Sequence, residues 1–150
     1  MTVIRPSVME DAAALAEIER ECFSEPWSMG AIQSTLATDS ACFFTAIEED
    51  TGMIVGYVGM LIAADIGEII NVAVTSACRR RGIGRRLLDA LDGVADEKHL
   101  SELQLEVRAS NAPAIALYTA LGYEIAGRRK NFYRKPTEDA LLMNKSLSHT

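Results

Sequence analysis

Cysteines are scarce in this sequence, and no two of them are close together along the chain. The three present, Cys22, Cys42 and Cys78, are odd in number, lie far apart and include no C-x-x-C motif. A disulfide framework or a zinc site requires cysteines that are more numerous or more closely spaced. We therefore expect neither, and assign no metal. This cysteine usage fits a reducing compartment, so a cytoplasmic protein is predicted.

Long hydrophobic runs are also missing. The longest, Met53–Ala64, is interrupted by Gly56 and Gly59 and is followed by Asp65. It is well short of the ~20 apolar residues that a membrane-spanning helix needs. The first residues, Met1–Pro6, lack the apolar stretch of a signal peptide. The sequence thus predicts no membrane partner.

Positive charge and histidine are in short supply. Lys and Arg number 15 against 21 Asp and Glu, which gives a net charge of −6. Nucleic-acid binding depends on neutralising phosphate, so no direct nucleic-acid partner is expected, and a basic partner suits the charge better. The two histidines, His99 and His149, have no Ser or Cys nucleophile motif nearby. Hydrolase-type Ser–His or Cys–His catalysis is therefore disfavoured, and both are predicted to be surface residues.

Hydrophobic periodicity predicts a layered protein of mixed α and β structure. The 150 residues correspond to one domain of ordinary size, and no linker or repeat divides them, so residues 1–150 are predicted to form a single domain. The spacing of apolar residues predicts helices over 12–22, 28–36, 83–98 and 111–121. It predicts strands over 3–5, 42–47, 53–62, 67–75, 102–107, 123–133 and 140–147.

Capping residues sharpen these helix bounds. Ser7 with Glu10 fits a capping box before the first helix. Ser28 is a candidate N-cap of the second. Pro113 stands in the first turn of the last helix, where proline is tolerated, and Gly122 is placed to end it.

A loop rich in arginine and glycine joins a strand to the most amphipathic helix. It reads Arg79-x-x-Gly82-x-Gly84, with further arginines on either side. The unpaired N–H groups at the start of a helix form an anion site, and glycine lets a phosphate approach the backbone. A Walker A motif and a complete G-x-G-x-x-G fingerprint are both absent. The alternative is an ordinary basic helix start.

These motifs resemble a known enzyme family. The Arg79–Gly84 loop resembles the pyrophosphate-binding loop of the GNAT acetyltransferase superfamily. The stretch Leu105–Tyr123 (L-E-V-R-A-S-N, then A-I-A-L-Y and L-G-Y) is similar to RimI-type ribosomal-protein-alanine N-acetyltransferases. Phe23–Ser28, Asn71–Val74 and Arg129–Tyr133 agree, and the resemblance spans about Ile4 to Met143. Phe132, where that family often has Tyr, is a small departure.

The resemblance implies the fold and the cofactor. It implies an α/β (mixed α+β) GNAT fold with a twisted, mixed, seven-stranded sheet flanked by about four helices. It implies acetyl-CoA as the acetyl donor, with CoA as product, and a gap between two splayed central strands that admits the pantetheine. The Val74 N–H is then the expected donor to the acetyl oxygen. The residues expected to bind the cofactor are Val72, Ala73, Val74, Arg79, Arg80, Arg81, Gly82, Ile83, Gly84, Arg85, Asn111 and Tyr118.

By the same resemblance Glu106 is the general base and Tyr118 the general acid. A phenol has a pKa of about 10 and stays protonated at neutral pH, so it can donate to a leaving thiolate. From the residues alone, Glu106 is equally well a solvent-facing carboxylate or a partner of Arg108. Tyr118 alone reads as a core aromatic, and Asn111 as a plain helix N-cap.

The expected acceptor is a protein N-terminus. An α-amine has a pKa of about 7.7–8.0, against about 10.4 for lysine, and so loses its proton more readily. The resemblance implies the N-terminal alanine of a small-subunit ribosomal protein, which is typically basic. The expected acceptor-binding residues are Trp27, Asn71, Glu106 and Tyr133.

Three alternatives stay open at this stage. The acceptor could be a broader set of N-termini, a lysine or a small amine. The chain could be a non-catalytic CoA-binding module. The basic stretch Arg128–Lys135 could stack on RNA, although in an acidic chain we expect a hairpin beside the acceptor site or a solvated edge. We expect a monomer or weak dimer.

Overall fold

Seven strands and four α-helices make up most of residues 1–147, which are the residues that the computed structural model describes. His149 lies outside them. The strands are β1 (Thr2–Pro6), β2 (Ala41–Glu48), β3 (Met53–Ala63), β4 (Ile66–Val74), β5 (Glu102–Arg108), β6 (Glu124–Tyr133) and β7 (Glu138–Ser146). The helices are α1 (Ala12–Cys22), α2 (Met29–Leu36), α3 (Ile83–Glu97) and α4 (Ala112–Ala120), with short 3₁₀ turns at Met9–Asp11 and Ser76–Cys78. No helix among these residues is long and apolar enough to span a bilayer.

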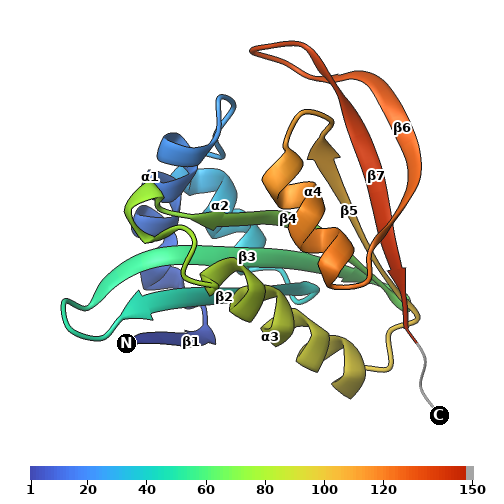
Figure 1. Cartoon of the computed structure of the whole chain (residues 1–150). Coiled ribbons are helices and arrows are strands. Elements are labelled where there is room, and N and C mark those ends of the chain that lie inside the picture. Colours follow the sequence, from blue (N-terminus) through green and yellow to red (C-terminus); the bar gives the residue numbers. More distant parts are fainter. Residues whose placement is uncertain (148–150) are drawn as a thin grey trace.

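One twisted sheet carries all seven strands, in the order β1-β2-β3-β4-β5-β7-β6. Every neighbouring pair is antiparallel except β4–β5, which is parallel. Helices α1 and α2 cover one face of the sheet, and α3 and α4 cover the other (Figure 1). The predicted mixed seven-stranded sheet with four flanking helices is therefore confirmed.

The capping signals have mixed outcomes. Ser28 caps α2 by accepting a hydrogen bond from the Ala31 N–H at 3.1 Å, as predicted. Gly122 follows α4 with φ of +99°, the conformation expected after a helix end. The Ser7–Glu10 capping box is wrong. Asp11 accepts from the Val8 N–H instead, at 2.9 Å, and the Ser7 hydroxyl turns to Thr45. A side chain from β2 thus outcompeted the local cap.

Helix α3 packs against the sheet through one continuous apolar face. Its buried residues recur every three or four positions, as they must for one face of a helix. They are Ile83, Leu87, Leu88, Leu91 and Ala95, and they join the larger of two hydrophobic clusters.

Leu91→Ala tests how much this face contributes to stability. Leu91 is completely buried, so truncation leaves a cavity and should lower the free energy of unfolding by about 2–5 kcal/mol. Urea denaturation measures the change. Asp89→Ala, on the exposed side of the same helix, should change it by less than about 0.5 kcal/mol. Equal effects of the two variants would contradict this packing.

The two central strands pair over only part of their length. The β4–β5 register runs from Ile66 opposite Glu102 to Ile69 opposite Leu105 and stops there. At the same point Ile70 is an extra residue against β3, because Met60 pairs with Ile69 and Gly59 with Asn71. A bulge bends its strand, so β4 turns away from β5 (Figure 1). The expected splay between the central strands is confirmed.

Candidate active site

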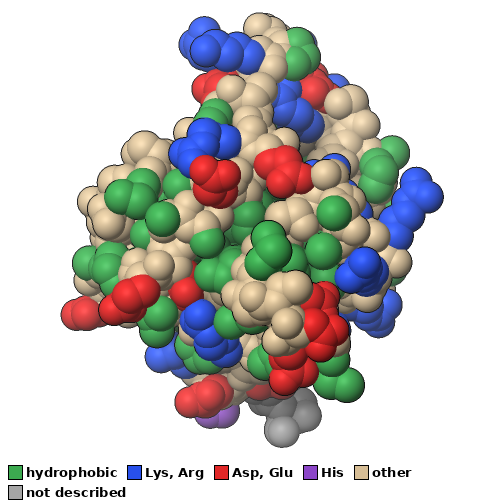
Figure 2. Space-filling model, turned by 90° about the vertical axis from the view of Figure 1, so that its left-hand side faces the viewer, with side chains coloured by type: hydrophobic (Ala, Val, Ile, Leu, Met, Phe, Trp, Pro, Cys, Tyr) green, Lys and Arg blue, Asp and Glu red, His purple; other side chains and the backbone are tan. Residues whose placement is uncertain are grey.

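A cavity of about 540 Å³ opens where β4 and β5 diverge. Its walls come from the middle of β4, the end of β5, the end of α1 and the segment that follows it, α4 and its N-cap, and the end of β6. Figure 2 shows the side of the molecule that lies to the left in Figure 1. Hydrophobic side chains gather in the middle of this face, and charged side chains of both signs surround them.

The cavity brings together side chains that lie far apart in the sequence. Seven of the predicted site residues line it, namely Trp27, Asn71, Val72, Glu106, Asn111, Tyr118 and Tyr133. Ala73, Val74 and the loop residues Arg79, Arg80, Arg81, Gly82, Ile83, Gly84 and Arg85 do not line it. These residues lie at the end of β4, in the loop that follows it and in the first turn of α3. The predicted residues thus fall into two neighbouring groups, one in the cavity and one at a helix start.

Glu106 extends from β5 on the face opposite the hydrophobic face of that strand. Leu105 and Val107 are buried in the core, whereas the Glu106 side chain is about a quarter exposed. Its Oε1 lies 3.8 Å from the Arg129 guanidinium, and its Oε2 is buried with no hydrogen-bond partner among residues 1–147. The alternative that Glu106 pairs with Arg108 is wrong, because Arg108 pairs with Glu138 at 3.2 Å. One carboxylate oxygen is therefore available to a water or a substrate.

Tyr118 lies on α4 at the boundary between core and cavity. It is 9% exposed and packs edge-on against Tyr123, with ring centroids 5.8 Å apart. Its hydroxyl makes no hydrogen bond within residues 1–147. Burial raises the pKa of Tyr118 to about 12, and the nearby Tyr133 adds to that rise. The side chain is thus both a core aromatic and a protonated donor that faces the cavity.

Beyond Ile69 the backbone of β4 has no partner strand on the side that faces the gap. The Thr75 N–H donates to the Val55 carbonyl at 2.8 Å, and antiparallel ladder bonds alternate along a strand. Val72 and Val74 therefore point their N–H and C=O groups away from β3, toward the side where β5 has diverged. Consistent with this, the Val74 carbonyl accepts from Arg79 Nε at 3.1 Å.

The loop before α3 leaves its backbone open. Gly82 is the N-cap with φ of +75°, supplies no capping side chain, and has nothing within 4 Å of where a Cβ would stand. The N–H groups of the first turn thus face outward. Two of the loop arginines already have partners within the protein. Arg79 donates to the Val74 carbonyl, and the guanidinium of Arg81 lies 3.5 Å from the Glu48 carboxylate. Positive charge and open donors together suit a phosphate.

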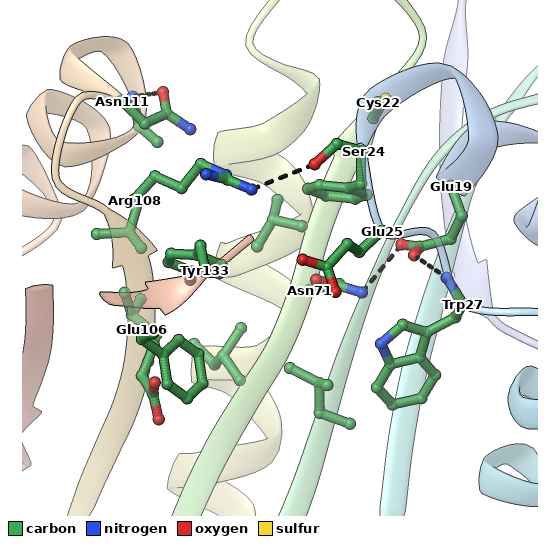
Figure 3. A pocket seen from close by; sticks show the side chains of 18 of the residues that line it. Glu19, Cys22, Ser24, Glu25, Trp27, Asn71, Glu106, Arg108, Asn111 and Tyr133 are labelled. Carbon is green, nitrogen blue, oxygen red and sulfur yellow. Dashed lines mark hydrogen bonds between the residues drawn. The ribbon is translucent and has the colours of Figure 1, made fainter. Parts of the chain in front are cut away.

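Glu19 is a functional candidate that the sequence analysis missed. It lies on α1, is fully buried and lines the cavity. It accepts hydrogen bonds from the Trp27 N–H at 2.8 Å and from Asn71 Nδ2 at 2.9 Å (Figure 3), and a third from the Tyr57 hydroxyl. Burial raises the pKa of Glu19, and the bonds from Trp27 and Tyr57 oppose that rise. The available signal was a charge at the spacing of the apolar face of α1.

Arg108 was also missed. It stacks over the Tyr133 ring at 4.7 Å and bridges to Ser24 between α1 and α2 (Figure 3). Its guanidinium also donates to two carbonyls of the β6–β7 turn, those of Arg134 at 2.7 Å and Pro136 at 2.9 Å. The Arg134 N–H in turn donates to Glu25 at 3.0 Å. These bonds connect β5 and the β6–β7 turn on one side of the cavity with the segment between α1 and α2 on the other. No local pattern in the sequence predicts them.

Two predicted residues have double roles. Asn111 is the N-cap of α4, since its Oδ1 accepts from the Ala114 N–H at 3.3 Å, which leaves its Nδ2 facing the cavity (Figure 3). Trp27 packs against the smaller hydrophobic cluster and also lines the cavity.

The basic stretch Arg128–Lys135 forms the predicted hairpin beside the cavity. The tip of this hairpin carries Lys and Arg side chains, which lie at the top of Figure 2.

The family model for the GNAT acetyltransferases matches residues 12–123 of this sequence. This chain belongs to the GNAT acetyltransferase family. The resemblance seen in the motifs is confirmed, and the GNAT sheet and helices are those described above. Acetyl-CoA is the acetyl donor of this family, so the predicted cofactor is confirmed as well.

Two named bacterial proteins match almost the whole length of this chain. A protein of Escherichia coli K12, named as a ribosomal protein bS18-alanine N-acetyltransferase, is 33% identical over 148 residues, covering 95% of this chain and 96% of the relative. A Bacillus subtilis protein is 35% identical over 140 residues, covering 93% and 92%, and bears the same name provisionally.

Solved structures agree with the sequence relatives. The crystal structure of the ribosomal-protein-S18-alanine N-acetyltransferase from Escherichia coli superposes with a TM-score of 0.92 at 32% identity, covering 100% of this chain and 96% of that one. The Ard1 structure from Thermoplasma volcanium has a TM-score of 0.89 at 24% identity, covering 99% of each, and speaks for the fold alone.

Proposed function

We propose that this GNAT protein, acting as one domain, acetylates the α-amine of the N-terminal alanine of a small-subunit ribosomal protein. The names of its relatives supply the acceptor: bS18 in Escherichia coli and, provisionally, in Bacillus subtilis. The observation that carries the proposal is the cavity at the strand divergence, which Glu106 and Tyr118 line together. One accepts a proton and the other donates one, as acetyl transfer to an amine requires.

The charge of the cavity favours a cationic acceptor. Four carboxylates line it and one guanidinium does so, and these side chains are Glu19, Glu25, Glu68, Glu106 and Arg108. An α-ammonium group is therefore attracted to the site before it is deprotonated. Its pKa of about 8 lets a single carboxylate complete that step near neutral pH, whereas lysine would resist it. The net charge of −6 suits a basic ribosomal protein in the same way.

Each residue has a role in this proposal. Glu106 takes the amine proton, directly or through a water on its free Oε2. The Val74 N–H donates to the acetyl oxygen as negative charge develops there. Tyr118, protonated because burial raises its pKa, supplies a proton to the departing sulfur. Trp27, Asn71 and Tyr133 contact the acceptor.

The open helix start and the strand gap fit the cofactor, which supplies a thioester-activated acetyl group. The arginines, Gly82 and Gly84 would hold its pyrophosphate against the first turn of α3. The outward-facing backbone of Val72 and Val74 would pair with the pantetheine, and Asn111 Nδ2 would add a donor from the far wall.

Gly82→Ala tests the pyrophosphate contact. At φ of +75° an alanine is strained, and its methyl group would occupy the open space before the helix. We expect the KM for acetyl-CoA to rise about tenfold, the equivalent of one hydrogen bond to a charged group. Gly52→Ala is the matched control, with φ of +72°, equal open space and a position in the β2–β3 turn. If both variants change KM alike, backbone strain rather than cofactor contact is responsible.

Mass spectrometry of acetyl transfer tests the function itself. The protein is incubated with acetyl-CoA and peptides that start with free Ala, Ser, Met or Gly, and with N-blocked peptides that contain lysine. We expect a 42-dalton acetyl increment on free N-termini alone, largest on Ala. Transfer to lysine alone would keep the family and overturn the acceptor. The absence of nucleic-acid and membrane partners, and a monomer or weak dimer, stay predictions.

A further inference from the structure

Glu19 is a buried carboxylate to which the proposed mechanism gives no proton-transfer role. It is fully buried on α1, and no Lys or Arg of residues 1–147 forms an ion pair with it. All three of its neighbours donate: the Trp27 N–H, the Tyr57 hydroxyl and Asn71 Nδ2. Three donors satisfy an ionised carboxylate, which only accepts. Burial of such a group is costly, and an apolar side chain would fill the same space at lower cost.

The hydrogen bonds from Asn71 fix the orientation of its amide. Its Nδ2 donates to Glu19 Oε2 at 2.9 Å and to the Tyr57 hydroxyl at 3.3 Å. The two ends of an amide are nearly equal in size, so its orientation depends on the neighbours that it bonds. In Figure 3 the Nδ2 of Asn71 faces Glu19, and its oxygen points to the other side, into the cavity. The cavity therefore receives an acceptor atom from Asn71, not a donor.

We propose that Glu19 is a positioning residue, which holds the Asn71 Oδ1 toward the acceptor amine so that the amine donates to it. The inference rests on the proposed function, because an amine has N–H groups to donate. With the amide reversed, Asn71 would present two N–H groups to the incoming ammonium group, and the contact would be repulsive. Glu19 thus determines the polarity of the acceptor site without touching the acceptor.

Glu19→Gln is the direct test. Gln has the same shape, but the backbone N–H of Trp27 can only donate, so the Gln oxygen takes the place of Oε1. The Gln nitrogen then takes the place of Oε2 and faces Asn71 Nδ2, donor against donor, and Asn71 would turn over. We expect the KM for an Ala-terminated peptide to rise about tenfold, one hydrogen bond to a charged group, while the KM for acetyl-CoA stays within about twofold. Tyr57→Phe is the matched control: it removes both bonds of the Tyr57 hydroxyl, the one to Glu19 and the one from Asn71, but leaves Asn71 bonded to Glu19, so the peptide KM should stay within about threefold.

A second substitution at Asn71 separates orientation from structural support. Asn71→Asp alone sets a carboxylate against Glu19 and should weaken peptide binding. In the Glu19→Gln background the same Asp accepts from the Gln nitrogen and still presents an oxygen to the cavity. The double variant should return the peptide KM to within about threefold of wild type. A residue that only supports the fold gives no such recovery.

The outcomes are distinct. Thermal melting verifies that each variant is folded, and Glu19→Met, apolar and of similar length, replaces Glu19→Gln if the latter does not fold. A wild type inactive on Ala-terminated peptides would refute the proposed function and this inference with it. An active wild type together with an unchanged peptide KM in the folded Glu19 variant, or with no recovery in the double variant, would refute the inference alone.

Discussion

Glu106→Gln is expected to lower kcat by about 10²–10⁴-fold, the usual contribution of a general base. The amide keeps the size of the side chain but cannot accept the amine proton. The KM for acetyl-CoA should stay within about threefold, because the loop before α3 is unchanged. Folding should also be unaffected: within residues 1–147 the one ion pair of Glu106 is the 3.8 Å approach to Arg129, whose side chain is 57% exposed. Steady-state kinetics on an Ala-terminated peptide measure the effect.

Glu68→Gln is the control for Glu106. Glu68 lines the same cavity from β4, and its loss removes one negative charge without removing the proposed base. We expect kcat to fall less than about threefold. If the two variants lose activity equally, the carboxylates act by attracting the acceptor. A fully active Glu106→Gln would assign the base elsewhere.

Tyr118→Phe is expected to lower kcat by about 10²-fold or more, because the leaving sulfur loses its proton donor. The hydroxyl makes no hydrogen bond within residues 1–147, so its removal should leave the thermal midpoint nearly unchanged. The pKa of Tyr118, raised to about 12, sets the pH dependence. Since the phenol is protonated below that value, the wild-type rate should show no loss from Tyr118 ionisation up to about pH 10.

Tyr123→Phe distinguishes chemistry from packing. Tyr123 is buried beside Tyr118, and burial raises its pKa too, but it does not line the cavity. Its variant should keep kcat within about threefold. A loss of kcat in both variants, with lower melting temperatures, would mean that the aromatic pair supports the site only through packing.

The double variant Glu106→Gln/Tyr118→Phe addresses the alternative of a CoA-binding module without catalysis. If the two residues act in one reaction, the double variant should be little worse than the poorer single variant, since residues that act as a unit are not additive. Acetylation unaffected by both changes would return the binding-module alternative.

Much of this protein follows from neighbouring residues alone. The period of α3, the Ser28 cap and the Gly122 helix end are encoded within a few residues of each other, and the structure has all three. The glycine-arginine loop likewise announces an anion site from its own composition. Glu106 and Tyr118 are predicted as base and acid because the motif Leu105–Tyr123 resembles a family; periodicity alone leaves the role of each open.

Only the tertiary structure decided what lies in the cavity. Glu19 and Asn71 are 52 residues apart, and Arg108 and Ser24 are 84 apart, yet each pair is hydrogen-bonded. No local pattern specifies such contacts, because they depend on how β4 bends away from β5 at the Ile70 bulge and on which elements that bend brings together. The sequence determined the elements and the kind of chemistry, whereas long-range packing decided which buried charge faces which donor.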